Sequence, residues 1–117
     1  MMISCDNSMN KLLRDTSNEM NKTCPMVIDE YTTLMNTGVI NESLMYNYKI
    51  NKDFFNDYDI SKSQWEKNQV NQLTNFYCTD PDFKLFKDNN VNVIWKYSDW
   101  DGFPIDKIEI NSNDCYN

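Results

Sequence analysis

The stretch LMYNYKI, residues 44–50, alternates between two sets of side chains, and this alternation constrains the fold more than any other feature of the chain. Neighbouring side chains of an extended strand point to opposite faces. One face would therefore carry Leu44, Tyr46, Tyr48 and Ile50. A strand with one apolar face is typical of an antiparallel sheet that is covered on one side only. Residues 91–97 repeat the pattern with Val91, Val93, Trp95 and Tyr97.

Each of these strands has a neighbour in sequence with which it can form a hairpin. Residues 26–35 are rich in β-branched side chains and are predicted to pair with 44–50, across a turn in NTGVINES. Residues 103–110 are predicted to pair with 91–97. Their apolar positions change parity between Ile105 and Ile108, which indicates a β-bulge near Asp106-Lys107.

The turn of the second hairpin lies in YSDWDGFP, which at first sight could hold calcium. Counted from Asp99, the sixth residue of an EF-hand loop would be Pro104 and the twelfth Ile110, where the motif requires glycine and glutamate. Asp101-Gly102 is instead a hairpin turn signal. Trp100 would then lie at the tip of the turn.

Two helices complete the pattern. Residues 6–22 and 61–78 have apolar side chains at helical spacing, and Ser63 with Glu66 fits a capping box. The second helix would turn its apolar stripe to the core through Trp65, Val70, Leu73, Phe76 and Tyr77. Asp80-Pro81 starts a further short helix that ends at Asn89-Asn90. The predicted fold is α+β, in the order α-β-β-α-β-β, with a four-stranded antiparallel sheet and helices on one face. A tail, residues 1–8, precedes a single domain, residues 9–117.

Charge and composition exclude several functions. The chain has 18 acidic and 11 basic residues, a net charge of −7, and no cluster of lysine and arginine. Nucleic-acid binding and attachment to an anionic membrane surface are therefore not expected. Histidine is absent, which removes serine and cysteine nucleophiles paired with histidine and the commonest zinc ligand. No apolar stretch is long enough for a membrane span. We predict no metal, no cofactor and no enzymatic activity.

The positions of the four cysteines favour one disulfide. Cys78 ends the second long helix and Cys115 follows the last strand, so the two can meet where helix and sheet end. Cys5 and Cys24 bracket the first helix, which would hold them about 25 Å apart. The alternative is that all four are thiols in a cytoplasmic protein, with Cys78 buried. Met2-Ile3-Ser4-Cys5 also resembles the end of a lipoprotein cleavage box, which makes Cys5 a candidate for lipid attachment.

Two groups of residues resemble a pattern found in small uncharacterised bacterial envelope proteins and lipoproteins. The first group is Asn21, Lys22, Pro25, Ile28, Asp29, Thr32, Leu34, Tyr46 and Tyr48. The second is Cys78, Asp80, Pro81, Asp82, the 91–97 strand, Asp99 to Gly102 and Cys115. Ile28 departs from the pattern, in which valine is usual. The resemblance implies an exported α+β domain with one disulfide and brings no catalytic residues.

Two functions remain from these observations. The first is a non-enzymatic envelope protein, periplasmic or lipid-anchored, that binds another protein; the residues expected to contact it are Trp100, Phe54, Phe55, Asp57 and Tyr58. The second is a small acidic inhibitor or immunity-type protein of the cytoplasm, bacterial or phage-borne, that masks a basic partner. A hydrolase that works with carboxylates is disfavoured, because no pair is placed for acid–base chemistry.

Overall fold

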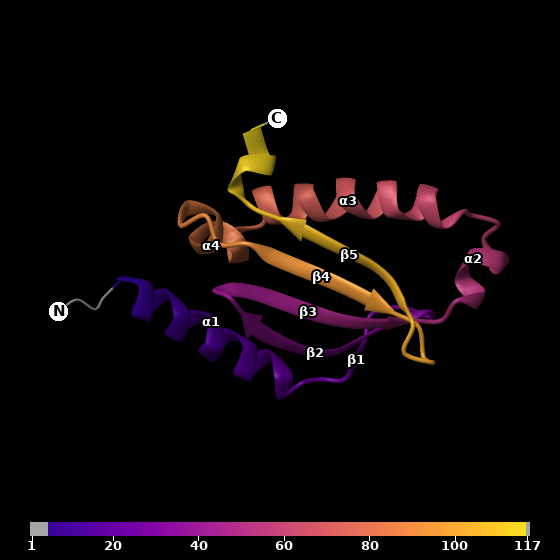
Figure 1. Ribbon diagram of the computed structural model, residues 1–117, viewed down its shortest axis with the longest axis horizontal. Helices are drawn as coiled ribbons and strands as arrows, with labels where there is room; N and C mark the ends of the chain where they lie inside the picture. The colour runs from indigo at the N-terminus through magenta and orange to yellow at the C-terminus, as the bar shows by residue number, and fades with distance from the viewer. Residues whose placement is uncertain (1–4, 117) are drawn as a thin grey trace.

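The structure of the protein is a computed structural model that describes residues 5–116, with side chains from Ser8 onward. Its elements are shown in Figure 1. In chain order they are α1 (Cys5–Asn21), β1 (Met26–Val27), β2 (Thr32–Ile40), β3 (Ser43–Ile50), α2 (Asp53–Asp57), α3 (Lys62–Thr79), the 3-10 helix η1 (Pro81–Phe83), α4 (Lys84–Asp88), β4 (Val93–Ser98), β5 (Pro104–Ile110) and the 3-10 helix η2 (Ser112–Tyr116).

The five strands form one mixed sheet in the order β1-β2-β3-β4-β5. The predicted α+β class is correct, but the predicted four-stranded antiparallel sheet is wrong in two respects. β1 adds a short edge strand beside Thr33 and Leu34. β3 and β4 run parallel, with Leu44 beside Val93. The chain leaves the end of β3, passes through α2, α3 and α4, and returns to the opposite end of the sheet, as a crossover between parallel strands requires.

The first hairpin closes within the predicted stretch, residues 36–43, but near its end. β2 continues through Gly38, and Ile40 pairs with Ser43. The two-residue turn is Asn41-Glu42, where both residues have positive φ, 48° and 65°. Two consecutive left-handed residues match the right-handed twist of the flanking strands, which explains why the hairpin closes at this pair rather than at the glycine.

The second hairpin contains the β-bulge that the parity change predicted, at a neighbouring position. Tyr97 pairs with Asp106 and Ser98 pairs with Pro104, so Ile105 is the extra residue of β5. The predicted position, Asp106-Lys107, is therefore slightly too late in the chain. The extra residue restores the parity, and Ile108 faces the core beside Trp95.

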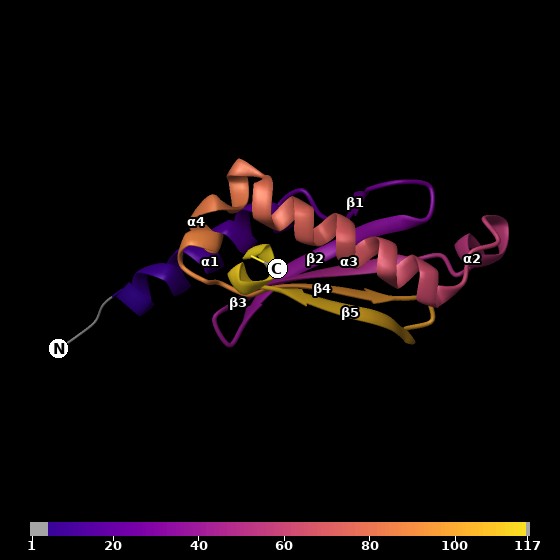
Figure 2. The same ribbon diagram turned by 90° about the horizontal axis from the view of Figure 1, so that it is seen from above.

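The helices cover one face of the sheet, and Figure 2 shows α3 and α4 above the strands. Leu13 from α1 and Tyr77 from α3 are fully buried against this face. Sheet aromatics form the floor of the core: Tyr46 stacks on Trp95 with ring centroids 5.6 Å apart, and Tyr48 on Tyr97 at 5.0 Å. Such pairs stabilise a core beyond the area they bury.

The apolar stripe of α3 is narrower than predicted. Trp65 and Tyr77 are buried, and Leu73 packs partly against the core. Val70 and Phe76 are 39% and 44% exposed, so their predicted place in the core is wrong. Residues four apart lie on one row of a helix. The buried row runs from Trp65 to Tyr77 in steps of four, and Val70 and Phe76 lie one position to either side.

The start of α3 gives a testable correction. The N-cap is Ser61, whose Oγ accepts the Gln64 N–H at 3.0 Å, and not the predicted capping box of Ser63 and Glu66. Loss of an N-cap costs about 1 kcal/mol. We expect Ser61→Ala to lower the free energy of unfolding by about 1 kcal/mol in urea denaturation. Ser63→Ala, the matched control within the helix, should change it by less than about 0.5 kcal/mol; equal effects would contradict the assignment.

Candidate functional site

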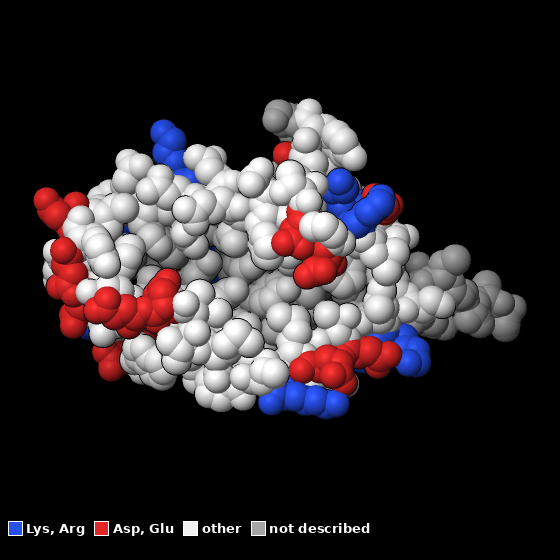
Figure 3. All heavy atoms as spheres, turned by 180° about the vertical axis from the view of Figure 1, so that it is seen from behind, with Lys and Arg blue, Asp and Glu red and all other residues white. Residues whose placement is uncertain are grey.

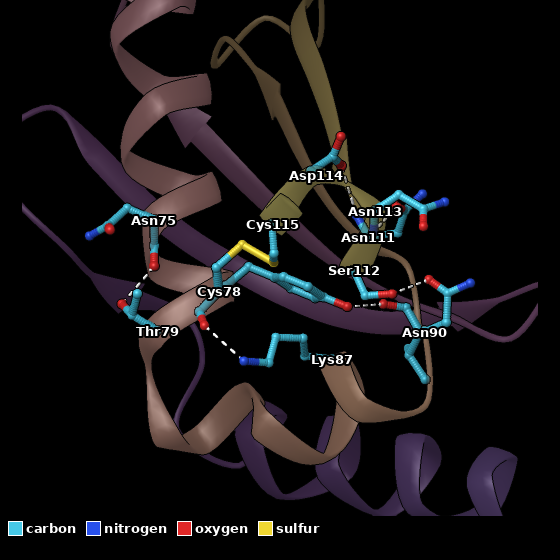
Figure 4. Close-up of a disulfide and its surroundings, with 12 residues drawn as sticks. Asn75, Cys78, Thr79, Lys87, Asn90, Asn111, Ser112, Asn113, Asp114 and Cys115 are labelled. Carbon is cyan, nitrogen blue, oxygen red and sulfur yellow. Dashed lines mark hydrogen bonds between the residues drawn. A yellow bond between two sulfur atoms is a disulfide. The ribbon is translucent and has the colours of Figure 1, made fainter. Parts of the chain in front are cut away.

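A disulfide joins the end of α3 to η2, and Figure 4 shows its surroundings. Cys78 and Cys115 form the bond, with their Cα atoms 5.5 Å apart, which is the pairing expected from the sequence. Lys87 Nζ donates to the Cys78 carbonyl at 3.1 Å, so α4 is tied to the same point. Cys24 is a half-buried free thiol. The side chain of Cys5, the predicted lipidation site, lies outside the described residues.

This disulfide favours an oxidising compartment over the cytoplasm, where thiols are kept reduced. The cytoplasmic alternative required Cys78 and Cys115 as thiols, and the structure joins them. No helix in the described part of the chain is long and apolar enough to cross a membrane.

A cleft of about 380 Å³ opens on the helix-covered face of the sheet, between α3 and the edge that carries β1. Figure 3 shows this face, hollowed between two ridges and lined mainly by uncharged residues. The wall from α3 includes Trp65, Gln69 and Leu73. The floor is formed by Tyr48 and Tyr97, and the opposite side by Ile28, Asp29 and Thr32.

The cleft exists because α1 covers only part of β2. Ser17 Oγ lies 2.7 Å from Thr37 Oγ1 in a buried hydrogen bond. At the end of α1, the Asn21 side-chain amide pairs with the backbone of Thr37, accepting its N–H at 2.7 Å and donating to its carbonyl at 3.0 Å. These contacts fix α1 near the β2–β3 turn. The rest of the sheet face, toward Tyr48 and Ile50, is left open to the cleft.

The cleft is lined mainly by apolar, aromatic and amide side chains. Among the described residues that line it, only Asp29 is charged. Gln69 Nε2 donates to the Tyr97 hydroxyl at 3.0 Å. Burial raises the pKa of Tyr97 to about 12, and burial also raises the pKa of Tyr48. Both phenols therefore stay protonated at neutral pH, and neither serves as a base. What remains is an apolar floor with amide groups on one wall, the composition of a ligand or peptide site.

The residues predicted to contact a partner divide between two places. Phe54 lines the cleft, and its ring packs against Tyr58, which is 60% exposed. Phe55 packs edge-on against Trp65 and contributes to the core. Asp57 accepts a 2.6 Å hydrogen bond from the Tyr31 hydroxyl, and this bond raises the pKa of Tyr31. Phe54, Phe55 and Asp57 lie in α2, and Tyr58 is its C-cap.

Trp100 lies elsewhere, at the tip of the β4–β5 hairpin, and is 56% exposed. Asp99 shapes this turn: it is buried, and its Oδ1 accepts the N–H groups of Asp101 and Phe103 at 2.9 and 3.0 Å. Gly102 supplies the positive φ of 92° that the turn needs. The carboxylate of Asp99 therefore holds the backbone of the turn in which it lies. Among the described residues, no three His, Cys, Asp or Glu side chains are grouped to hold a metal ion.

Sequence reasoning missed the cleft residues Ile28, Gln69, Gln72 and Leu73 as a site. A signal did exist, because Gln69 and Gln72 interrupt the apolar stripe of the helix on its core-facing side. Amides at such positions need either a buried partner or access to solvent. Gln69 has Tyr97 as its partner, and Gln72 is exposed at the rim.

A pair of carboxyl groups links α3 to β5 at the other side of the helix. Asp106 Oδ2 is buried and receives no N–H or O–H from the described residues. The group beside it is Glu66, whose pKa is raised above its ordinary 4.5 by hydrogen bonding to Asp106 and by the charge of that residue. Two carboxyl groups can share a hydrogen bond only while one of them holds a proton.

This pair makes stability depend on pH. Because the pKa of Glu66 is raised in the folded state, protonated Glu66 contributes to the free energy of unfolding. This contribution is fully present below pH 4.5 and is lost as the pH rises through the folded-state pKa. We expect Glu66→Gln to flatten the pH dependence of the melting temperature above pH 4.5 and to raise the melting temperature at pH 7. Thermal melts between about pH 4 and pH 8 measure this. Glu42→Gln, an exposed charge-matched control, should keep the slope of the parent chain; if it matches Glu66→Gln, the pair is not responsible.

The fold and the site together define a small α+β domain. It has a five-stranded mixed sheet, helices on one face and a cleft beside the longer helix. No protein-family model matches the chain, and no curated protein matches it in sequence. Three solved structures share the fold.

The first of these structures is a Pseudomonas aeruginosa protein thought to be secreted, with 14% identity, a TM-score of 0.82, and coverage of 97% of this chain and 99% of that one. The second is EpsS, a pilotin of the Vibrio vulnificus type 2 secretion system, with 10% identity, a TM-score of 0.76 and 94% coverage of both chains. The third is the type II secretion pilotin AspS of Vibrio cholerae, with 11% identity, a TM-score of 0.69 and 94% coverage of both chains. At these identities the likeness shows the fold.

Proposed function

We propose that this protein is a small, non-enzymatic protein of the bacterial cell envelope that binds a protein partner in the cleft between α3 and β1, in a role similar to that of a pilotin. The cleft is the observation that carries the proposal. The disulfide supports an oxidising compartment. The fold, shared with two secretion-system pilotins, supports an envelope assembly as the setting.

The cleft defines the chemistry of the partner. Its floor would take apolar side chains, and the rim adds the exposed Ile28 at 51% and Val27 at 74%. Exposed apolar residues next to a concave site mark binding surfaces more than isolated ones do. Asp29 lines the cleft, and its neighbour Glu30 is exposed as well. We therefore expect a partner segment with apolar side chains and a lysine or arginine beside them.

The arrangement of the ends is compatible with a lipid anchor at Cys5, which stays part of the proposal. α1 begins at one end of the long axis, and α2 and the β4–β5 turn lie at the other (Figure 1). A chain held to a membrane through Cys5 would present Tyr58 and Trp100 away from it. Mass spectrometry of the mature protein from its own host tests this directly: an acylated Cys5 is expected, and an unmodified Cys5 would leave the periplasm as the proposed location.

Site-specific photo-crosslinking tests the cleft. A photoreactive amino acid at Gln72, at the rim, should crosslink to a specific envelope protein in intact cells, and mass spectrometry would identify it. The same substitution at Asn71, which is exposed on α3 but does not line the cleft, is the matched control and should give no such product.

A second variant checks that the cleft itself is occupied. With the photoreactive amino acid placed at Gln69, which also lines the cleft, Gln72→Trp should fill the rim and abolish the crosslink, while Asn71→Trp should leave it intact. Crosslinks of equal yield from Gln72 and Asn71 would contradict a cleft-specific partner. Products with a basic cytoplasmic protein would favour the inhibitor hypothesis instead.

A further inference from the structure

The face of the sheet that the helices leave open carries an unusual arrangement of charge. Lys96 of β4 and Lys107 of β5 are direct cross-strand partners, and both side chains are exposed. Directly opposite residues have Cβ atoms about 4.5–5.5 Å apart, so two ammonium groups here repel each other. The chain as a whole is acidic, with a net charge of −7, so two adjacent lysines are an unusual feature of its surface.

No described carboxylate forms an ion pair with either lysine. The salt bridges of the described residues involve Lys11, Lys22, Lys52 and Lys84. Glu109 lies on the same face, and its Oε2 accepts from Asn92 Nδ2 at 3.1 Å. Lys49, the next lysine on this face, donates to the Asp99 carbonyl at 3.2 Å. Within the part of the chain that the structure describes, Lys96 and Lys107 are thus two adjacent cations without an ion pair, and Glu109 is the carboxylate nearest to Lys107 along this face of β5.

The lysine pair borders a cavity of about 390 Å³, separate from the cleft on the other face. Its floor is apolar, with Met45 half-buried and Ile94 only 6% exposed, and Ile40 forms part of its rim. The amides of Asn41 and Asn92, the hydroxyl of Ser43 and the carboxylate of Glu109 complete the lining. The volume lies in the range of small-molecule sites. An apolar floor with two cations at one side is complementary to a molecule that is apolar at one end and anionic at the other.

We propose that this cavity binds a small amphiphilic oxyanion, a phosphate or carboxylate group on an apolar body, with the anionic group between Lys96 and Lys107. An anion placed there converts the repulsion of the lysines into two attractions. A bare anion would leave the apolar floor unused. An anionic bilayer is disfavoured, because the net charge of −7 repels such a surface. The ligand is therefore a single molecule, and the site is independent of the proposed partner cleft.

Titration with octyl phosphate below its micelle concentration, followed by amide NMR shifts, tests the proposal. We expect saturable shifts around Ile94, Lys96 and Lys107. Lys96→Gln combined with Lys107→Gln should weaken binding at least tenfold. The matched control, Lys62→Gln combined with Lys67→Gln, removes the same charge from exposed positions on α3 and should change the affinity by less than twofold.

Two further probes separate the parts of the ligand. Inorganic phosphate and octanol should each bind at least tenfold more weakly than octyl phosphate; equal binding of phosphate would reduce the site to a simple anion site and overturn the proposal. Unsaturable shifts, or equal affinity in the Lys96 and Lys107 variant, would also overturn it. Lys107→Glu should abolish binding, since it reverses one of the two charges that would hold the anionic group.

Discussion

Removal of the Cys78–Cys115 disulfide should lower the free energy of unfolding by about 4 kcal/mol. The bond joins residues 37 positions apart, and a cross-link across a loop of this length restricts the unfolded chain by about that amount. Small domains are stable by only about 5–15 kcal/mol, so the reduced protein would lose a large part of its margin. Urea denaturation of the oxidised protein and of Cys78→Ser combined with Cys115→Ser measures the difference.

The reductant itself supplies the control. Adding it should destabilise the parent chain and leave the double serine variant unchanged, because the variant has no disulfide to break. Cys24→Ser, at the half-buried free thiol, should keep the sensitivity of the parent chain to reductant. A double variant as stable as the oxidised protein would show that the bond contributes nothing to folding.

Trp95→Ala should cost about 3–5 kcal/mol, the range for removal of a large aromatic side chain from a core. Trp95 is 1% exposed and lies on the central part of the sheet, stacked on Tyr46 and facing Phe83 at 6.2 Å. Replacement by alanine would leave a void between the sheet and the 3-10 helix η1. The free energy of unfolding, measured in urea, reports the loss.

The same substitution at Trp100 is the matched control. Trp100 is 56% exposed at the hairpin tip, so Trp100→Ala should change stability by less than about 0.5 kcal/mol. If it destabilises the protein as strongly as Trp95→Ala, the tip packs against the domain and is not free for a partner. If stability is kept while crosslinking from Gln72 falls, Trp100 takes part in binding.

Local signals in the sequence predicted the elements whose physical cause is local. The alternation in residues 44–50 and 91–97 follows from the period of a strand. β3 covers the first segment, and β4, which begins two residues later than predicted, covers most of the second; the expected face of each strand is turned to the core. The helix 61–78 was predicted to within one residue at each end. Asp80 is the N-cap of the 3-10 helix at Pro81, as its side chain and the proline indicated.

Most of the errors concern pairings and contacts between distant parts of the chain, although the N-cap of α3 was also placed two residues too late, at Ser63 instead of Ser61. β1 has only Met26 and Val27, too few residues to show a period. Nothing local distinguishes a parallel from an antiparallel neighbour for β3, because its two faces read alike in either case. The cleft could not be predicted from local signals either. It depends on where α1 and α3 lie across the sheet, and contacts between distant residues, such as Ser17 with Thr37, set those positions. The aromatic group around Phe54 was found because its composition alone is unusual.

The parallel pairing of β3 with β4 has a consequence for how the chain folds. Each hairpin, β2–β3 and β4–β5, joins strands that are neighbours in sequence, so each can form early and by itself. The pairing of β3 with β4 puts Leu44 beside Val93. It requires closure of the long loop that contains α2, α3 and α4, and this closure carries the largest entropic cost in the topology. The rate-limiting event should therefore be the docking of two preformed hairpins. Substitutions at the β3–β4 seam should slow refolding, whereas substitutions in η2 should mainly speed unfolding.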